Sequence, residues 1–162
     1  MLIRYCKIIL VASVALFASL VVVNNLTDCG ANFAFVQHVL MMDTIFPNSP
    51  AARRAVSSPF LQHAAFAAII LFEAAVALLC WVGTAMLLKA VGRGEAAFQR
   101  SKSIAIGGLT LGFCLWFTGF IGIAGEWFLM WQSAQWNAQQ AAFRIAMLIG
   151  IVLLFLCLRD PE

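Results

Sequence analysis

The sequence predicts an all-α integral membrane protein: a bundle of four transmembrane helices, with a short amphipathic helix in the outer loop between helices 1 and 2. Of its 162 residues, 64% are hydrophobic and only 10% are charged, whereas a soluble domain is about half apolar and about a quarter charged. The apolar residues gather in four segments, each near the roughly 20 residues that span a bilayer as a helix. A chain of this size cannot cover so much apolar surface in one core, so we expect lipid to be its solvent.

We expect a single domain, residues 1–162, with spans at about residues 8–26, 60–88, 104–126 and 141–158. Backbone groups that face lipid must be hydrogen-bonded within their own segment, which favours a closed helical bundle. The first span follows Arg4 and Lys7, as the core of a cleaved signal peptide would. It is long for a signal core, and no convincing small-residue cleavage site precedes "NNLTDCG". These features favour a retained helix over a cleaved signal.

The outer loop, residues 24–59, contains the stretch "FAFVQHVLMMDTIF" (Phe33–Phe46). Its apolar residues recur at helical spacing, and those that would share one face are Phe33, Val36, Leu40 and Ile45. His38 and Asp43 lie elsewhere on the same helical projection. The pattern predicts an amphipathic helix that lies on the membrane or caps the bundle.

The basic residues predict the orientation of the bundle. Seven of them flank the spans on one side: Arg4, Lys7, Lys89, Arg93, Arg100, Lys102 and Arg159. Only Arg53 and Arg54 lie in the outer loop. Because lysine and arginine concentrate on the cytoplasmic side of a membrane protein, we expect both termini in the cytoplasm. The net charge of +3 reports this topology, and no nucleic-acid partner is expected.

Two ionisable residues fall inside the spans, where charge is costly and marks a functional candidate. A helix rises 1.5 Å per residue, which puts Glu73 about 22 Å from the cytoplasmic end of helix 2. The same rise puts Arg144 about 21 Å from the cytoplasmic end of helix 4. Opposite charges at one level predict a buried Glu73–Arg144 ion pair. The pair would either fix the register of the helices, as buried polar pairs do, or form a proton or ion site.

The stretch "GEWFLMWQSAQWNAQQAAFR" (Gly125–Arg144) joins the third and fourth spans. Its tryptophans predict an aromatic belt at the membrane interface, and surfaces rich in tryptophan and poor in charge are also what protein partners bind. We therefore predict an outer-face interface that consists of Glu126, Trp127, Trp131 and Trp136. Glu126 is expected to be an anchor at headgroup level, within reach of Arg144, Arg53 or Arg54.

The third span carries a Gly-x-x-x-Gly pattern at Gly108 and Gly112. Small residues at this spacing let a second helix approach closely. The neighbour is either another helix of this chain or a helix of another subunit, and the sequence leaves both open.

The two histidines, His38 and His63, both fall on the outer side. Histidine at this position can ligate haem or a metal ion. The two lie on different elements, however, and no cysteine or second carboxylate stands at ligand spacing from them. We therefore predict no metal site and no cofactor.

Several of these segments resemble a bacterial family of predicted small integral membrane proteins of unknown function. The resemblance rests on the run from Gly125 to Arg144, on "NNLTD" and "FVQHVLMMDT" before it, and on Glu73 in the second span. It covers nearly the whole chain. It implies a four-helix inner-membrane protein of a Gram-negative bacterium, and it brings no activity or catalytic residue.

The function favoured by these observations is that of a non-catalytic accessory subunit of a larger bacterial inner-membrane complex. It would dock through its aromatic outer face or its glycine-rich third helix, with membrane lipids and other integral membrane subunits as partners. A small proton- or ion-coupled transporter centred on Glu73 and Arg144 is an alternative. A haem- or quinone-binding redox protein that uses His38 or His63 is another. No nucleophile–base pair is evident, so an enzyme is not expected.

Overall fold

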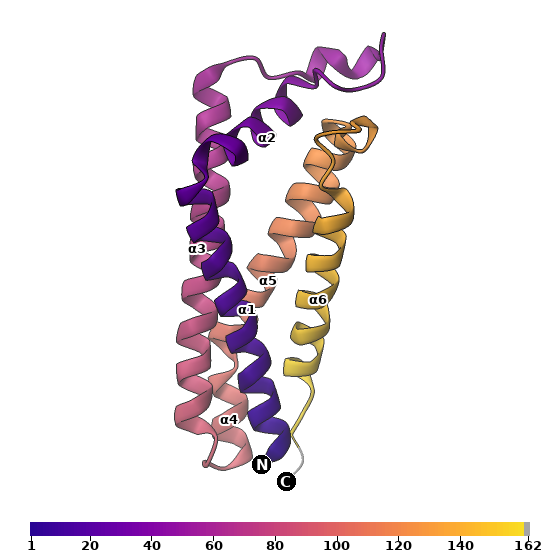
Figure 1. Ribbon diagram of the computed structural model, residues 1–162. Helices are drawn as coiled ribbons and strands as arrows, with labels where there is room; N and C mark the ends of the chain where they lie inside the picture. The colour runs from indigo at the N-terminus through magenta and orange to yellow at the C-terminus, as the bar shows by residue number, and fades with distance from the viewer. Residues whose placement is uncertain (161–162) are drawn as a thin grey trace.

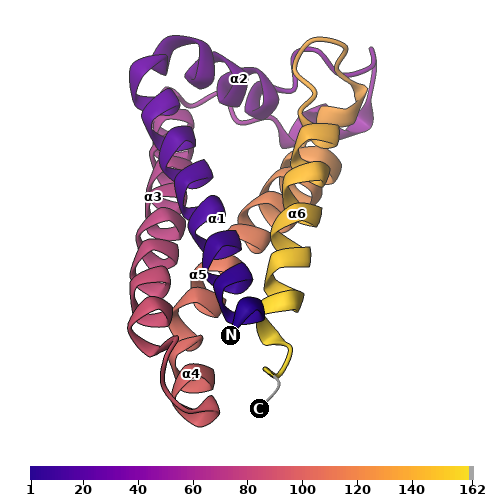
Figure 2. The ribbon, with the colours of Figure 1, turned by 60° about the horizontal axis from the view of Figure 1, so that its bottom comes forward.

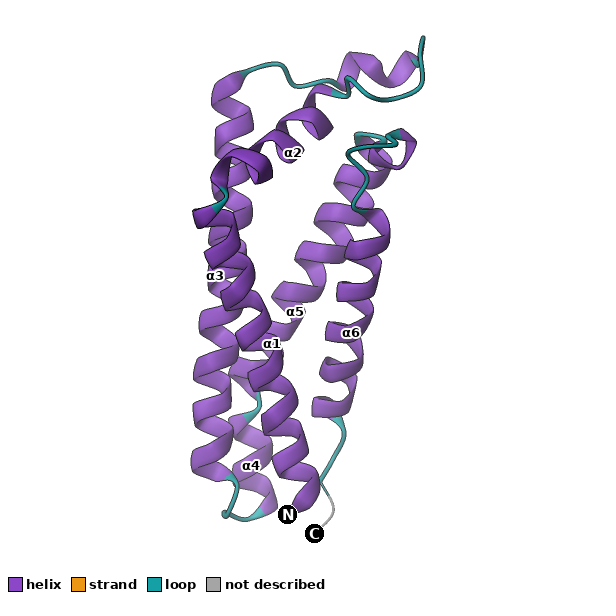
Figure 3. Cartoon of the chain, in the orientation of Figure 1, coloured by secondary structure: helices purple, strands orange, loops and turns teal. Residues whose placement is uncertain are grey.

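The chain folds into helices joined by short connections. The computed structural model describes residues 1–160, and no β-strand occurs among them (Figures 1 and 3). The elements in chain order are α1 (Leu2–Thr27), α2 (Cys29–Met41), η1 (Pro50–Arg54), α3 (Pro59–Ala90), α4 (Glu95–Ser101), α5 (Ser103–Cys114), η2 (Leu115–Trp127), η3 (Met130–Gln132) and α6 (Gln139–Cys157). η1 and η3 are short 3-10 helices, whereas η2 is a wider π-type helix that continues α5. The predicted all-α fold is confirmed.

Four helical stretches are long and apolar enough to cross a membrane. They are Leu2–Thr27, Pro59–Ala90, Glu95–Trp127 and Gln139–Cys157. The third begins at Glu95 rather than near residue 104, because part of the predicted polar turn folds as α4. This short helix buries Phe98 and Ser101 against the bundle, which explains why a basic and polar sequence remains helical there.

α3 is the central helix, against which both α1 and α5 pack, while α5 also contacts α6. Where α3 and α5 meet, a Cβ atom added at Gly83 would lie 2.6 Å from the Cβ of Ala105. One added at Gly108 would lie 2.9 Å from the Sγ of Cys80. Gly112 likewise faces Val76 of α3. The glycines of the Gly-x-x-x-Gly pattern therefore allow close helix packing within this chain.

The bundle is V-shaped. The N-terminus and the end of α6 lie at its narrow end. Toward the opposite end, α5 with η2 leans away from α1 and α3, together with α6 (Figures 1 and 2). We call the narrow end, with Arg4, Lys7 and Lys102, the basic end. We call the wide end, with Trp131 and Trp136, the aromatic end. α2 lies across the wide end and bridges the two arms of the V.

The predicted helix of the outer loop is α2, although its bounds differ. α2 begins directly after α1, with the non-helical Asp28 between them, and ends at Met41. The next residue, Met42, caps it with a left-handed φ of 52°. Val36 and Val39 form its buried side, and Gln37 donates a 3.0 Å hydrogen bond to Gln62 of α3. The helix therefore caps the bundle, and Ile45 lies beyond its end.

Candidate functional site

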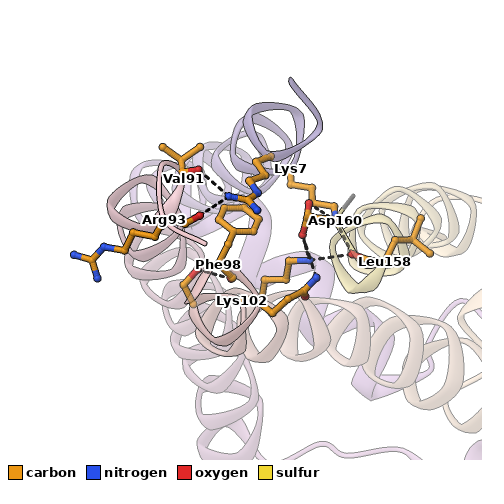
Figure 4. A network of polar contacts seen from close by, with 10 residues as sticks. Lys7, Val91, Arg93, Phe98, Lys102, Leu158 and Asp160 are labelled. Carbon is orange, nitrogen blue, oxygen red and sulfur yellow. Dashed lines mark hydrogen bonds and ion pairs between the residues drawn. The ribbon is translucent and has the colours of Figure 1, made fainter. Parts of the chain in front are cut away.

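The basic end is closed by a carboxylate between two lysines (Figure 4). The Nζ atom of Lys7 lies 3.0 Å from one carboxylate oxygen of Asp160, and that of Lys102 lies 2.7 Å from the other. The three side chains are at most 2% exposed. Both ammonium groups also donate to the carbonyl of Leu158, at 2.6 and 2.9 Å. Together these bonds tie the segment that follows α6 to α1 and to the residue between α4 and α5.

The charge of Asp160 is well compensated despite its burial. Burial alone would raise the pKa of this carboxyl, but hydrogen bonds and positive charge from Lys102 and Lys7 outweigh it and hold the pKa below its usual value. An acid with this pKa remains a carboxylate at neutral pH. The cluster is therefore a structural clamp with all its groups paired.

Arg4 extends the clamp to the turn between α3 and α4. Its guanidinium donates to the carbonyls of Val91 and Arg93, at 3.1 and 2.7 Å, and lies over the ring of Phe98 (Figure 4). Basic residues predicted to share one side of the membrane thus do gather at one end of the molecule. Sequence reasoning missed Asp160. The signal that could have revealed it is an acidic residue directly after the fourth span, on the side where the basic residues gather.

At the aromatic end, the outer loop covers the tryptophans that were predicted to form an interface. The guanidinium of Arg54 lies 4.5 Å from the centre of a Trp127 ring and donates to the Trp127 carbonyl. The ring of Trp136 stacks on His38 at 4.5 Å, and Phe46 packs edge-on against Trp131 at 5.8 Å. All three tryptophans therefore have contacts within this chain.

Part of the predicted outer face nevertheless remains accessible. Trp127 is 55% exposed and Trp131 is 43% exposed. Glu126 is exposed too, and its nearest polar contact is the amide of Gln139 at 3.5 Å rather than an arginine.

Of the other residues predicted in the outer loop, Arg53 is exposed, and Asp43 lies 2.7 Å from the Nδ1 atom of His38. His63 lies on α3, whereas His38 lies on α2, and the ring of His63 is 4.2 Å from that of Phe33. In residues 1–160, no group of three or more histidine, cysteine, aspartate or glutamate side chains is placed to hold a metal ion. The two histidines thus contact different aromatic rings and do not form a common site.

The predicted Glu73–Arg144 ion pair is wrong. Glu73 is buried, at 3% exposure, but its partner is Asn25, whose amide donates a 2.6 Å hydrogen bond to the carboxylate. Arg144 is exposed on α6, and its side chain makes no ion pair or hydrogen bond with the residues described. The rise of a helix predicts only position along its axis, and it says nothing about the side of the helix on which a residue lies. The buried face of α6 holds Ala142 and Ala146. Arg144 is two residues from each of them, about 200° around the axis, and so lies on nearly the opposite side of the helix.

Glu73 lines a pocket of about 270 Å³ under α2, between α1, α3 and η2. The polar residues of its wall are Glu73, Asn24, Asn25 and Asn32, and its large aromatic residues are Phe35, Phe66, Trp116 and Phe120. In this pocket a buried carboxylate with one neutral donor is surrounded by aromatic rings.

A second pocket, of about 290 Å³, adjoins the first. Its wall is apolar and comes from α2, α3 and the wide helix η2. The two pockets share Phe35, Val36, Ile69 and Phe120. The wide half of the V thus holds two adjoining pockets, one with an acid in its wall and one with an apolar wall. We call the two together the hollow.

Comparison with known proteins agrees with this architecture. Residues 3–159 match the family described as "Predicted small integral membrane protein (DUF2165)". No curated protein and no solved structure matches the chain. The match covers nearly the whole sequence, and four apolar helices of spanning length lie within or across it. The chain therefore belongs to the DUF2165 family of small integral membrane proteins.

Proposed function

We propose that this protein is a non-catalytic membrane protein that binds a lipid-soluble molecule in the hollow between α1, α3 and η2. The observation that carries this proposal is the pair of adjoining pockets, of about 270 and 290 Å³, one acidic and one apolar. Sites for small molecules are usually concave and mostly apolar, with a few polar groups that orient the ligand. Glu73 and Asn25 are such groups.

The apolar pocket can be reached from the side of the bundle. Ala68, Phe72 and Ile123 line it and are also exposed. All three belong to helices of the membrane spans, so their exposed surface faces lipid. A molecule dissolved in the bilayer would enter laterally, without passing through water.

A photoactivatable probe tests this proposal. The full-length protein in liposomes is incubated with a neutral long-chain alcohol that carries a diazirine, irradiated, and mapped by mass spectrometry of its peptides. We expect saturable labelling around Phe72 and Ile123, and non-saturable labelling at Leu154, which is 71% exposed on α6.

The variant Ala68→Phe should abolish the saturable labelling because the new ring fills the apolar pocket. Ala67→Phe is the matched control, since Ala67 is its exposed neighbour and does not line the pocket. Labelling that never saturates, or that is the same in both variants, would contradict the proposal.

A second candidate function is that of an accessory subunit in a bacterial inner-membrane complex. It is favoured by the exposed Arg144 on α6, because a cation on a lipid-facing helix is costly unless an anionic group meets it. The exposed surfaces of Trp127 and Trp131 add aromatic area of the kind that interfaces use. We propose that α6 and this surface would face a carboxylate-bearing helix of another membrane subunit.

Cross-linking in intact cells tests the subunit proposal. A photoreactive amino acid replaces Leu148, which is 65% exposed one turn from Arg144, or Leu78, which is 64% exposed on α3. A protein-sized adduct of constant mass from position 148 and none from position 78 is expected. Lipid adducts alone from both positions would count against a partner at α6.

We also propose that the basic end lies in the cytoplasm, since basic residues concentrate there and only Arg53 and Arg54 lie in the outer loop. A C-terminal green fluorescent protein should then fluoresce, and a C-terminal alkaline phosphatase should be inactive. The reverse pattern would invert the orientation.

A further inference from the structure

We infer that the molecule bound in the hollow is an amphipathic organic cation, with its positive charge at Glu73 and its apolar part in the adjoining apolar pocket. This inference rests on the proposed binding function and adds to it the chemical class of the ligand.

The first argument is the missing counter-charge at Glu73. Glu73 is 3% exposed, and its carboxyl group accepts one hydrogen bond, from the neutral amide of Asn25. In residues 1–160, no lysine or arginine forms an ion pair with it, nor does any line either pocket. A buried carboxylate is costly unless a cation or several donors compensate it. A cationic ligand supplies the charge that the chain does not.

The aromatic wall of the same pocket also favours a cation. Phe66, Trp116 and Phe120 line it together with Glu73, and the rings of Trp116 and Phe120 stack at 4.7 Å. The faces of such rings attract cations, most strongly where water is excluded. An anionic amphiphile, such as a fatty acid, would instead meet the charge of Glu73 with no basic residue in either wall.

The adjoining pocket accounts for the amphipathic part of the ligand. A metal ion or ammonium ion would occupy only the space near the carboxylate and would leave the apolar pocket of about 290 Å³ unused. The two pockets share four wall residues and therefore lie side by side, and the inferred ligand spans both. A charged head with an aromatic or aliphatic body matches both walls.

Competition between two probes tests the inference. Tetraphenylphosphonium is the cation, triphenylphosphine oxide is its neutral counterpart, and each competes with the diazirine alcohol for saturable labelling of the wild-type protein. We expect tetraphenylphosphonium to displace the label at a concentration on the order of tenfold lower, because a desolvated charge pair contributes at least that factor.

Glu73→Gln preserves the shape and the bond from Asn25 but removes the charge, so it should abolish the preference for the cation and retain displacement by the neutral probe. Glu126→Gln is the matched control, since Glu126 is exposed and lies outside both pockets, and it should retain the preference.

The outcomes separate this inference from the proposed function. Equal displacement of the label by both probes in the wild-type protein, or a preference that survives Glu73→Gln, would overturn the cation assignment and leave a neutral ligand. Displacement by neither probe, together with labelling that does not saturate, would overturn the binding function itself. The comparison of probes on the wild-type protein does not depend on how any variant folds.

Discussion

Two buried acids in this molecule have opposite surroundings. Asp160 at the basic end lies between two lysine ammonium groups, at 3.0 and 2.7 Å. Glu73 in the wide half of the bundle has one neutral partner, the amide of Asn25 at 2.6 Å. A buried charge whose partners are all present stabilises a fold, whereas one without a counter-ion costs stability. The comparison indicates that the basic end serves the structure, and it motivates our proposal that the counter-ion of Glu73 is a bound ligand.

Packing differs between the same two regions. At the narrow part of the V, the backbones of α3 and α5 are so close that Gly83 has no room for a methyl group against Ala105. In the wide half, η2 leans away and two pockets remain. Buried volume that is left unfilled costs packing energy, so the hollow is another feature that stability alone does not explain.

The largest effect is expected from Asp160→Ala. It leaves the ammonium groups of Lys7 and Lys102 buried without their carboxylate, and breaking a buried pair in this way costs about 3–5 kcal/mol. Unfolding in detergent micelles, followed by circular dichroism, measures the loss. Arg159→Ala is the control, because Arg159 is adjacent and exposed. A cost similar to that of the control would mean that Asp160 is not a clamp.

A smaller loss is expected from Gly83→Ala, since its Cβ would lie 2.6 Å from the Cβ of Ala105. Overpacking of this kind costs about 1–3 kcal/mol. Gly107→Ala is the matched control, because no atom beyond its chain neighbours and the backbone of its own helix lies within 4 Å of a Cβ at that position. It should leave the protein as stable or more stable, since alanine favours helix more than glycine does. Equal effects of the two variants would contradict the close crossing of α3 and α5.

The clamp should also give the protein a sensitivity to acid. Because the pKa of Asp160 is lower in the folded protein than its usual value of 3.8, the carboxylate contributes stability that is fully present above the unfolded pKa of about 3.9. That contribution is lost as the pH falls through the folded pKa. The unfolding midpoint should fall less steeply below about pH 4 in Asp160→Asn than in the wild type. Identical acid profiles of the two proteins would show that the lysines do not lower the pKa of Asp160.

Glu73→Gln should change the stability far less than Asp160→Ala does. Removing a charge that has no counter-ion in the chain should change the stability of the ligand-free protein by less than about 1 kcal/mol, with a gain as readily as a loss. The same unfolding experiment measures it. A loss as large as that of Asp160→Ala would reveal a cationic partner for Glu73 within the folded chain.

The smallest effect is expected from Arg144→Leu, which should leave the unfolding midpoint unchanged because Arg144 is exposed on α6. Combined with Glu73→Gln, its effect should be additive, as for residues that share no contact. A clear coupling between the two substitutions would support the Glu73–Arg144 ion pair.

Sequence reasoning was accurate for features that depend on composition and on position along one helix. Four apolar stretches of spanning length, a helix in the outer loop and the gathering of basic residues at one end all follow from such local signals. Its prediction of an ion pair for Arg144 was wrong, because packing between helices decides which side of α6 faces the bundle. It also missed the clamp, since Lys7, Lys102 and Asp160 are far apart in the chain and meet only after folding.

Hydrophobic patterning therefore determines that this chain enters a membrane and how many times it can cross it, because burial of apolar surface is roughly additive along the sequence. The depth of Glu73 follows in the same way from the constant rise of a helix. Only the tertiary structure decides which groups surround Glu73 at that depth. The lean of η2 away from α3 and the rotation of α6 leave this acid without a cation, beside a hollow lined by aromatic rings, and both depend on contacts between distant segments.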